Sequence, residues 1–115
     1  MTPVNPNIEA KNIRWLILAI LHEKRRTGHA ESGGWLALPV LRKLLDMQGY
    51  PLSIDELKDY CVYLADVEIG CLEAKREGMA APYTYKYRIT AKGVRAVDYE
   101  EVVPGVGIYW AKEES

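Results

Sequence analysis

The stretch PLSIDELKDYCVYLADVEIG, residues 51–70, gives the clearest indication of a helix in the chain. Ser53 is followed three residues later by Glu56, a spacing typical of a capping box, in which each side chain bonds a backbone N–H at the start of a helix. Apolar side chains then recur at helical spacing and predict the buried face, which consists of Ile54, Leu57, Tyr60, Cys61, Leu64 and Val67. We therefore expect a helix that begins at Ser53 and packs against a core.

The opposite face of this predicted helix is acidic. At the helical period it carries Asp55, Asp59, Val62 and Asp66. From residue 53 to residue 69 there are five acidic side chains and one base, Lys58, so this segment has a net charge of −4. Such a helix should repel DNA, because carboxylates face the phosphates without releasing counterions.

A first helix is predicted over about residues 8–26, with Asn7 as its N-cap. Its main apolar stripe consists of Ile13, Leu16, Ile17, Ile20 and Leu21. Trp15 and Leu18 lie outside this stripe. The helix should therefore be covered on two sides, by another element or by another subunit.

A second helix is predicted between the first and the acidic one. The polar stretch HAESGGW, residues 29–35, separates it from the first helix and indicates a flexible connector. Pro39 is suited to its first helical position and Gly49 to its end. Its buried face should carry Leu41, Leu44 and Leu45.

A β-hairpin is predicted after Gly70. The residues CLEAKREGMAAPYTYKYRIT, 71–90, form two alternating stretches around a turn that contains glycine and proline. In the second strand one face should carry Tyr83, Tyr85, Tyr87 and Ile89, and the other Thr84, Lys86 and Arg88. Thr90 then caps a short helix, and the apolar stretch VVPGVGIYW, residues 102–110, follows as a tail. The expected fold is α+β and mainly helical, with three helices, a hairpin, a short C-terminal helix and an apolar tail.

Two segments resemble winged helix-turn-helix regulators of the MarR and PadR type. YKYRITAKGVRAV, residues 85–97, is similar to their junction of strand and helix, in which an aromatic residue or Leu, a Thr and a Lys-Gly pair recur. LSIDELKDYCVYLADVEIGCLEAKR, residues 52–76, resembles their third helix and first wing strand. The resemblance to MarR and PadR regulators covers about residues 10–98. The chain is also similar to small uncharacterised winged-helix proteins of Mu-like phages and prophages. It implies one winged-helix domain over residues 1–115, with a core at about 8–98 and a tail at 99–115.

Length and composition restrict the class of protein. A chain of 115 residues with 49% apolar and 27% charged residues can form one domain with its own core. Its longest wholly apolar run, WLILAIL at residues 15–21, is shorter than the roughly 20 residues that span a bilayer. No export leader is evident, so we expect a cytoplasmic protein that does not bind membranes.

The sequence indicates neither an enzyme nor a cofactor. Cys61 and Cys71 are too few for a disulfide framework and should be free thiols. Their spacing, together with His22 and His29, matches no compact zinc site. Motifs such as G-x-S-x-G and H-E-x-x-H are absent. We therefore expect no catalytic residue, no bound metal and no cofactor.

Basic residues concentrate in and after the predicted hairpin. Residues 75–95 hold six bases and one acid, a net charge of +5, although the whole chain has a net charge of −1. In the family that the chain resembles, the third helix contacts bases in the major groove and the wing contacts the DNA backbone. The resemblance thus implies a transcriptional regulator that binds double-stranded DNA, and here the wing should supply most of the attraction. The candidate DNA-binding residues are Arg42, Lys43, Ser53, Lys58, Lys75, Arg76, Lys86, Arg88 and Lys92.

A second class of function is a protein-interaction module. The acidic face formed by Asp55, Asp59, Val62 and Asp66 would dock a basic protein. Ordinary solvated charges would give the same pattern, since protein surfaces normally mix both signs.

Apolar side chains outside the predicted core indicate self-association. Regulators of the type that the chain resembles are usually two-fold, so we expect a homodimer. Its interface would contain Trp15, Leu18, Val106, Ile108, Tyr109 and Trp110. If the tail folded back on the first helix instead, both apolar surfaces would be hidden in a monomer.

Overall fold

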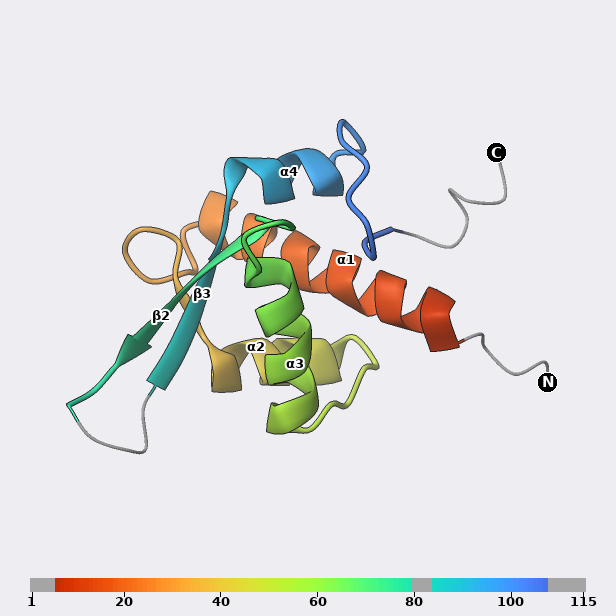
Figure 1. Cartoon of the computed structure of the whole chain (residues 1–115). Coiled ribbons are helices and arrows are strands. Elements are labelled where there is room, and N and C mark those ends of the chain that lie inside the picture. The colour runs from red at the N-terminus through yellow and green to blue at the C-terminus, as the bar shows by residue number, and fades with distance from the viewer. Residues whose placement is uncertain (1–5, 80–83, 108–115) are drawn as a thin grey trace.

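The computed structural model describes residues 6–79 and 84–107 (Figure 1). Its elements in chain order are α1 (Pro6–Arg26), β1 (Leu36–Ala37), α2 (Leu38–Met47), α3 (Ile54–Ala65), β2 (Leu72–Glu77), β3 (Thr84–Ile89) and α4 (Ala91–Val97). Within the described residues these elements make four helices and one three-stranded antiparallel sheet. The expected α+β class is confirmed.

β3 is the central strand of the sheet, whose order is β1-β3-β2. The predicted hairpin is confirmed, because β2 pairs with β3 in antiparallel register. β1 was not predicted. It has two residues, too few to show alternation, and it pairs with a distant part of the chain, with Leu36 opposite Tyr87. Residues 29–35, expected to be a flexible connector, therefore lead directly into a strand.

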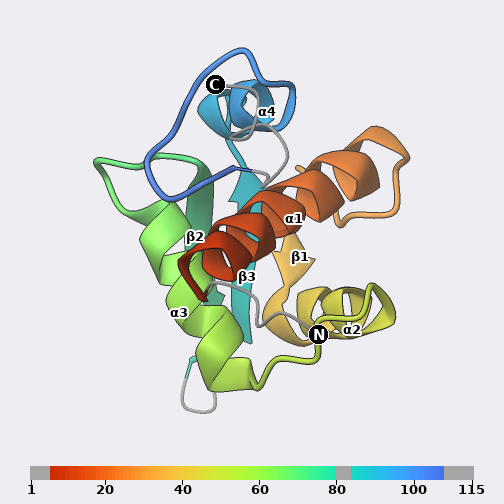
Figure 2. The same ribbon diagram turned by 90° about the vertical axis from the view of Figure 1, so that its right-hand side faces the viewer.

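α1 forms the centre of the helical layer. In Figure 2 it crosses in front of the sheet, with α4 on one side and α2 and α3 on the other. The largest fully buried side chains include Ile17, Leu18, Leu21, Leu41, Leu45, Leu57, Leu64 and Ile89. The core thus lies where α1 meets α2, α3 and β3. None of the helices in the described part of the chain has the length and apolar content needed to cross a membrane.

The capping box of α3 is confirmed. The backbone N–H of Glu56 donates to Ser53 Oγ over 3.1 Å, and the backbone N–H of Ser53 donates to Glu56 Oε1 over 3.0 Å. The predicted core face is correct for the three residues at its centre, Leu57, Cys61 and Leu64. It is wrong at both ends, because Ile54 is 36% exposed and Val67 is 96% exposed. Val67 lies outside because α3 ends at Ala65 and the following residue has ψ of 143°, which leaves the helical region.

The predicted first residues of the other helices can also be compared with the structure. α1 begins at Pro6, so Asn7 lies inside the helix and its prediction as N-cap is wrong. Proline suits a first turn because its φ is fixed and it needs no N–H partner there. α2 begins at Leu38, one residue earlier than predicted, so Pro39 is its second residue and still lies in the first turn. Thr90 caps α4 as predicted, since its Oγ accepts from the Gly93 N–H over 3.1 Å.

The segment after α4 folds back on α1. The Tyr99 ring stacks on Trp15 with 6.2 Å between ring centroids and 15° between ring planes. Val103 is buried in the core. The Gly107 N–H donates to the Lys11 carbonyl over 3.4 Å. The second apolar side of α1 is therefore covered by its own chain.

This covering alters the predicted dimer interface. Leu18 is fully buried inside the chain, so its assignment to a surface between subunits is wrong. It lies within the core because α4 and the segment after it pack over α1. Trp15 is partly buried beside Tyr99, and Val106 is partly buried against the core. The remaining interface residues of the prediction, Ile108, Tyr109 and Trp110, lie outside the described residues.

Candidate interaction surface

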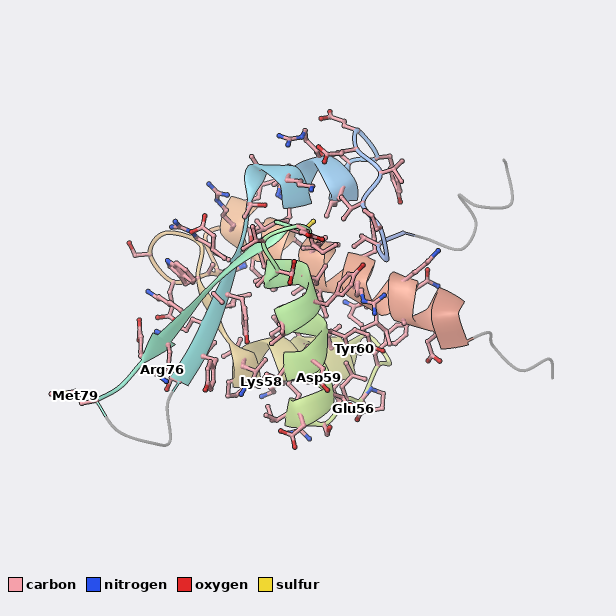
Figure 3. The ribbon with its side chains drawn as sticks, viewed as in Figure 1. Glu56, Lys58, Asp59, Tyr60, Arg76 and Met79 are labelled. Carbon is pink, nitrogen blue, oxygen red and sulfur yellow. The ribbon has the colours of Figure 1, made fainter. Side chains whose placement is uncertain are left out.

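Lys86 on β3 is enclosed by carboxylates of its own chain. Its Nζ lies 2.6 Å from Glu31 Oε1 and 2.9 Å from Glu77 Oε2, and its side chain is only 12% exposed. Hydrogen bonds to Glu31 and then to Glu77 raise the pKa of Lys86. This cation, predicted to contact DNA, is therefore already paired. Figure 3 places Arg76, another predicted contact, near the far end of the hairpin, with the exposed Met79 beyond it.

Glu73 and Trp35 hold the neighbouring cations of the hairpin. Arg88 donates from Nη2 and Nε to one oxygen of Glu73 over 2.8 and 3.2 Å. The Lys75 Nζ lies 3.1 Å from Glu77 Oε1. The Trp35 ring contacts both cations, with its centroid 4.4 Å from Lys75 Nζ and 4.7 Å from Arg88 Cζ. The contacts of Trp35 therefore join the hairpin to the residue just before β1.

The folded chain thus neutralises much of the positive charge counted in the sequence. The net charge of +5 for residues 75–95 included a single acid. In the structure Glu31, which precedes β1, pairs with Lys86, and Glu73, in β2 of the hairpin itself, pairs with Arg88. Glu101 Oε1 lies 2.9 Å from Arg95 Nε, and Glu101 Oε2 lies 3.9 Å from Lys92 Nζ. Each such exposed pair contributes at most about 1 kcal/mol to stability, but it places a carboxylate where a phosphate would have to bind.

Two predicted DNA contacts on α2 have a different environment. Arg42 Nε donates to the Leu52 carbonyl over 2.8 Å, and Lys43 is exposed. Neither forms an ion pair within the described residues. Both line a hollow of about 380 Å³ between α2 and the turn that follows it, together with Pro39, Asp46, Pro51 and Leu52. Ser53, also predicted to contact DNA, uses its hydroxyl in the cap of α3.

The predicted acidic face of α3 is exposed. Asp55, Asp59, Val62 and Asp66 all lie on the surface, and Val62 is 57% exposed. Lys58, the basic residue of this helix, points away from the acidic face and toward the hairpin, with its Nζ 4.3 Å from the Tyr85 ring centroid. Figure 3 shows Lys58 and Glu56 on opposite sides of α3. The acidic face therefore keeps its negative charge.

Beside the acidic face lies a hollow of about 230 Å³ between α1 and α3. Its lining consists of Arg14, Glu56, Asp59 and Tyr60. The backbone N–H and then the hydroxyl of Ser53 lower the pKa of Glu56, so this residue is a carboxylate at neutral pH. No ion pair within the described residues neutralises Glu56 or Asp59.

Arg14 is held at the wall of this hollow by other partners. Its Nη1 donates to the Gly105 carbonyl over 3.0 Å. Its Cζ lies 4.3 Å from the Tyr63 ring centroid and 5.5 Å from that of Tyr60. The Tyr63 hydroxyl in turn donates to the Pro104 carbonyl over 2.7 Å. Arg14 therefore anchors the segment after α4 instead of pairing with the carboxylates of α3.

The sequence did not predict this hollow. The sequence pattern predicts a capping role for Glu56 and a buried position for Tyr60, and it indicates no role for Arg14. Glu56 does have the capping role, but it also lines the surface beside Asp59. No spacing along the chain could indicate that the N-terminal half of α1 lies against the first turns of α3.

The two cysteines are not poised for nucleophilic chemistry. Both are buried free thiols. Burial raises the pKa of Cys61 to about 12 and also raises the pKa of Cys71. Both are therefore protonated at neutral pH. In residues 6–79 and 84–107 no group of three or more His, Cys, Asp or Glu side chains is placed to hold a metal ion.

Comparison of the chain with protein-family models, with curated proteins and with solved structures gives no match.

Proposed function

We propose that the protein is a winged helix whose α3 docks a basic protein partner. The order of one helix, a short strand, two helices and a hairpin supports the winged-helix assignment. The sheet order β1-β3-β2, with the hairpin extending from it, supports it as well. The resemblance to MarR and PadR regulators points in the same direction. Fold alone does not fix function, so the partner must be inferred from the surface.

The positions of the unpaired charges favour a basic protein as the partner. Asp55 and Asp59 have no ion-pair partner within the described residues, whereas Lys75, Lys86 and Arg88 each have one. A molecule that approaches α3 therefore meets negative charge. Opposite charges increase the rate of encounter and select the partner. Val62, exposed at the centre of the acidic face, offers apolar contact that adds affinity.

DNA binding is the second candidate function. It is favoured by Arg42 and Lys43, which have no carboxylate partner within the described residues, and by the winged-helix resemblance. In that case the protein would be a transcriptional regulator and a two-fold dimer. The carboxylates of α3 oppose DNA binding, because each would repel a nearby phosphate. The repulsion is roughly 1 kcal/mol for two charges about 4 Å apart in water. Light scattering at tens of micromolar, on the order of usual working concentrations, would test the dimer.

Two titrations decide between these functions. A labelled lysine-rich helical peptide with a leucine stripe and a labelled random-sequence duplex are each titrated with the protein at two salt concentrations. We expect the peptide to bind and the duplex not to bind at low salt. The triple variant Asp55→Asn, Asp59→Asn, Asp66→Asn should weaken the peptide complex.

A matched control removes the same number of charges elsewhere. The variant Glu9→Gln, Glu23→Gln, Glu100→Gln changes three exposed acids outside α3 and should keep most of the peptide affinity. Duplex binding with a steep salt dependence, together with no peptide binding, would establish the second candidate and refute the first.

A further inference from the structure

We propose that the partner inserts an arginine side chain into the hollow between α1 and α3 while the rest of its surface covers the acidic face. This inference rests on the proposed function and names the chemistry that the site selects. The occupant is a segment of a different protein, with arginine beside an apolar residue.

The charge of the lining favours a cation. Glu56 and Asp59 contribute two carboxylates and Arg14 one guanidinium, a net charge of −1. Arg14 is already engaged by the Gly105 carbonyl and the Tyr63 ring, so it does not compensate the two carboxylates by pairing with them. Only Oε1 of Glu56 is used in the cap, which leaves its other carboxylate oxygen for a partner.

The shape and composition of the lining favour guanidinium over ammonium. A guanidinium group is planar, presents several N–H donors and stacks on aromatic rings, whereas an ammonium group is a compact, strongly hydrated charge. The hollow offers carboxylate oxygens from Glu56 and Asp59 and the aromatic ring of Tyr60. Its volume of about 230 Å³ suits one side chain and is too small for a folded element. Hydrogen bonds between ions of opposite charge are the strongest available to such a site.

The neighbouring surface supplies the rest of the footprint. On α3 Asp59 belongs both to the hollow and to the acidic face, so the two surfaces are continuous. Val62 follows three residues later and lies on the same side of the helix. A partner that places arginine in the hollow would therefore bring an adjacent apolar side chain over Val62.

The test compares two peptides and two variants of the full chain. The labelled peptides have the same length and leucine stripe, one with arginines and the other with lysines at the basic positions. The hollow variant, Glu56→Gln with Asp59→Asn, removes two charges, and glutamine preserves the capping box. The matched variant, Asp66→Asn with Glu68→Gln, removes two exposed charges, one of them from the acidic face, and leaves the lining of the hollow unchanged. Circular dichroism confirms that both variants fold.

We expect the wild type to prefer the arginine peptide several-fold. The hollow variant should lose about ten-fold or more of this affinity and the preference with it, whereas the matched variant should lose about three-fold or less. Equal losses in both variants, without a preference for arginine, would overturn the arginine site and leave the acidic face as a general docking surface. Failure of both peptides to bind the wild type would overturn the inference and the proposed function together. A dimer of the protein alone that the hollow variant abolishes would assign the site to a second copy and overturn the inference.

Discussion

Replacing Gly93 by alanine should destabilise the protein, although alanine is the better helix former. Gly93 lies in α4, within the Lys-Gly pair that carries part of the resemblance to MarR and PadR proteins. A Cβ on Gly93 would lie 2.5 Å from the Cys71 carbonyl oxygen and 2.6 Å from Ile89 Cγ1. The carbonyl cannot move freely, because it accepts the Thr90 N–H over 3.0 Å next to the start of β2.

The magnitude follows from two opposing effects. Replacing glycine by alanine within a helix gains about 1 kcal/mol from helix propensity. Forcing an extra methyl group into a packed site costs about 1–3 kcal/mol, and more when backbone must shift. The lost or strained hydrogen bond to Cys71 adds about 1 kcal/mol. We therefore expect a net loss of about 2 kcal/mol in the free energy of unfolding, which lowers Tm by about 8–16 °C in a domain of roughly 100 residues.

Urea denaturation followed by circular dichroism measures this loss. Gly107→Ala is the control, because a Cβ at Gly107 meets no atom within 4 Å and its N–H contact with Lys11 is kept. The control should stay within about 0.5 kcal/mol of the wild type. An alanine variant at Gly93 that is as stable as the wild type would refute the close packing of α4 on the start of β2.

Four further outcomes follow from the same contacts. As measured by anisotropy, the double variant Asp55→Asn, Asp59→Asn should bind the lysine peptide more weakly than wild type; if the wild type does bind duplex DNA, the variant should bind it more tightly, and a weaker DNA complex would mean that these acids make favourable contacts to DNA. Tyr99→Ala should lose about 1 kcal/mol of stability in urea through its stack on α1, since an aromatic pair contributes about 0.5–1.5 kcal/mol; alanine keeps the Cβ and with it the cost of φ 61°, so an unchanged midpoint would mean that the stack does not stabilise the fold. Glu31 and Glu77 raise the pKa of Lys86 above its ordinary value of 10.5. The stability that these two ion pairs contribute is therefore complete below pH 10.5 and should fall as the pH rises through the pKa of Lys86 in the folded protein. Lys86→Met should flatten this part of the dependence of stability on pH. Cys61 should resist a thiol reagent at pH 8 in the folded chain and react after unfolding; rapid labelling of the native protein would contradict its burial.

Local features of the sequence determined the helices and the hairpin. The capping box at Ser53, the cap at Thr90 and the proline near the start of α2 each act within a few residues, so their effects can be found without the fold. The alternation of Tyr85 and Tyr87 with polar residues likewise placed β3. The acidic face of α3 was also predictable, because helical periodicity alone puts its carboxylates on one side.

The ends of elements were harder to predict. α3 stops at Ala65 because the backbone of the next residue leaves the helical region, and Val67 is therefore outside the core. β1 has no local pattern of its own and exists because Leu36 and Ala37 meet β3. Its formation depends on a partner strand that lies far along the chain.

Only the tertiary structure decided which charges remain unpaired. The sequence counted the bases of residues 75–95 as a positive segment, but Glu31 and Glu101 come from other parts of the chain and Glu73 lies across the hairpin from Arg88, and all three pair with these bases. The hollow beside α3 likewise depends on where Arg14 of α1 lies relative to Glu56. Caps and periodicity are local and can be found in a sequence, whereas electrostatic attraction depends on distance in space. The sequence by itself therefore determined the elements and the acidic face, and the fold decided which surface of the protein keeps its charge for a partner.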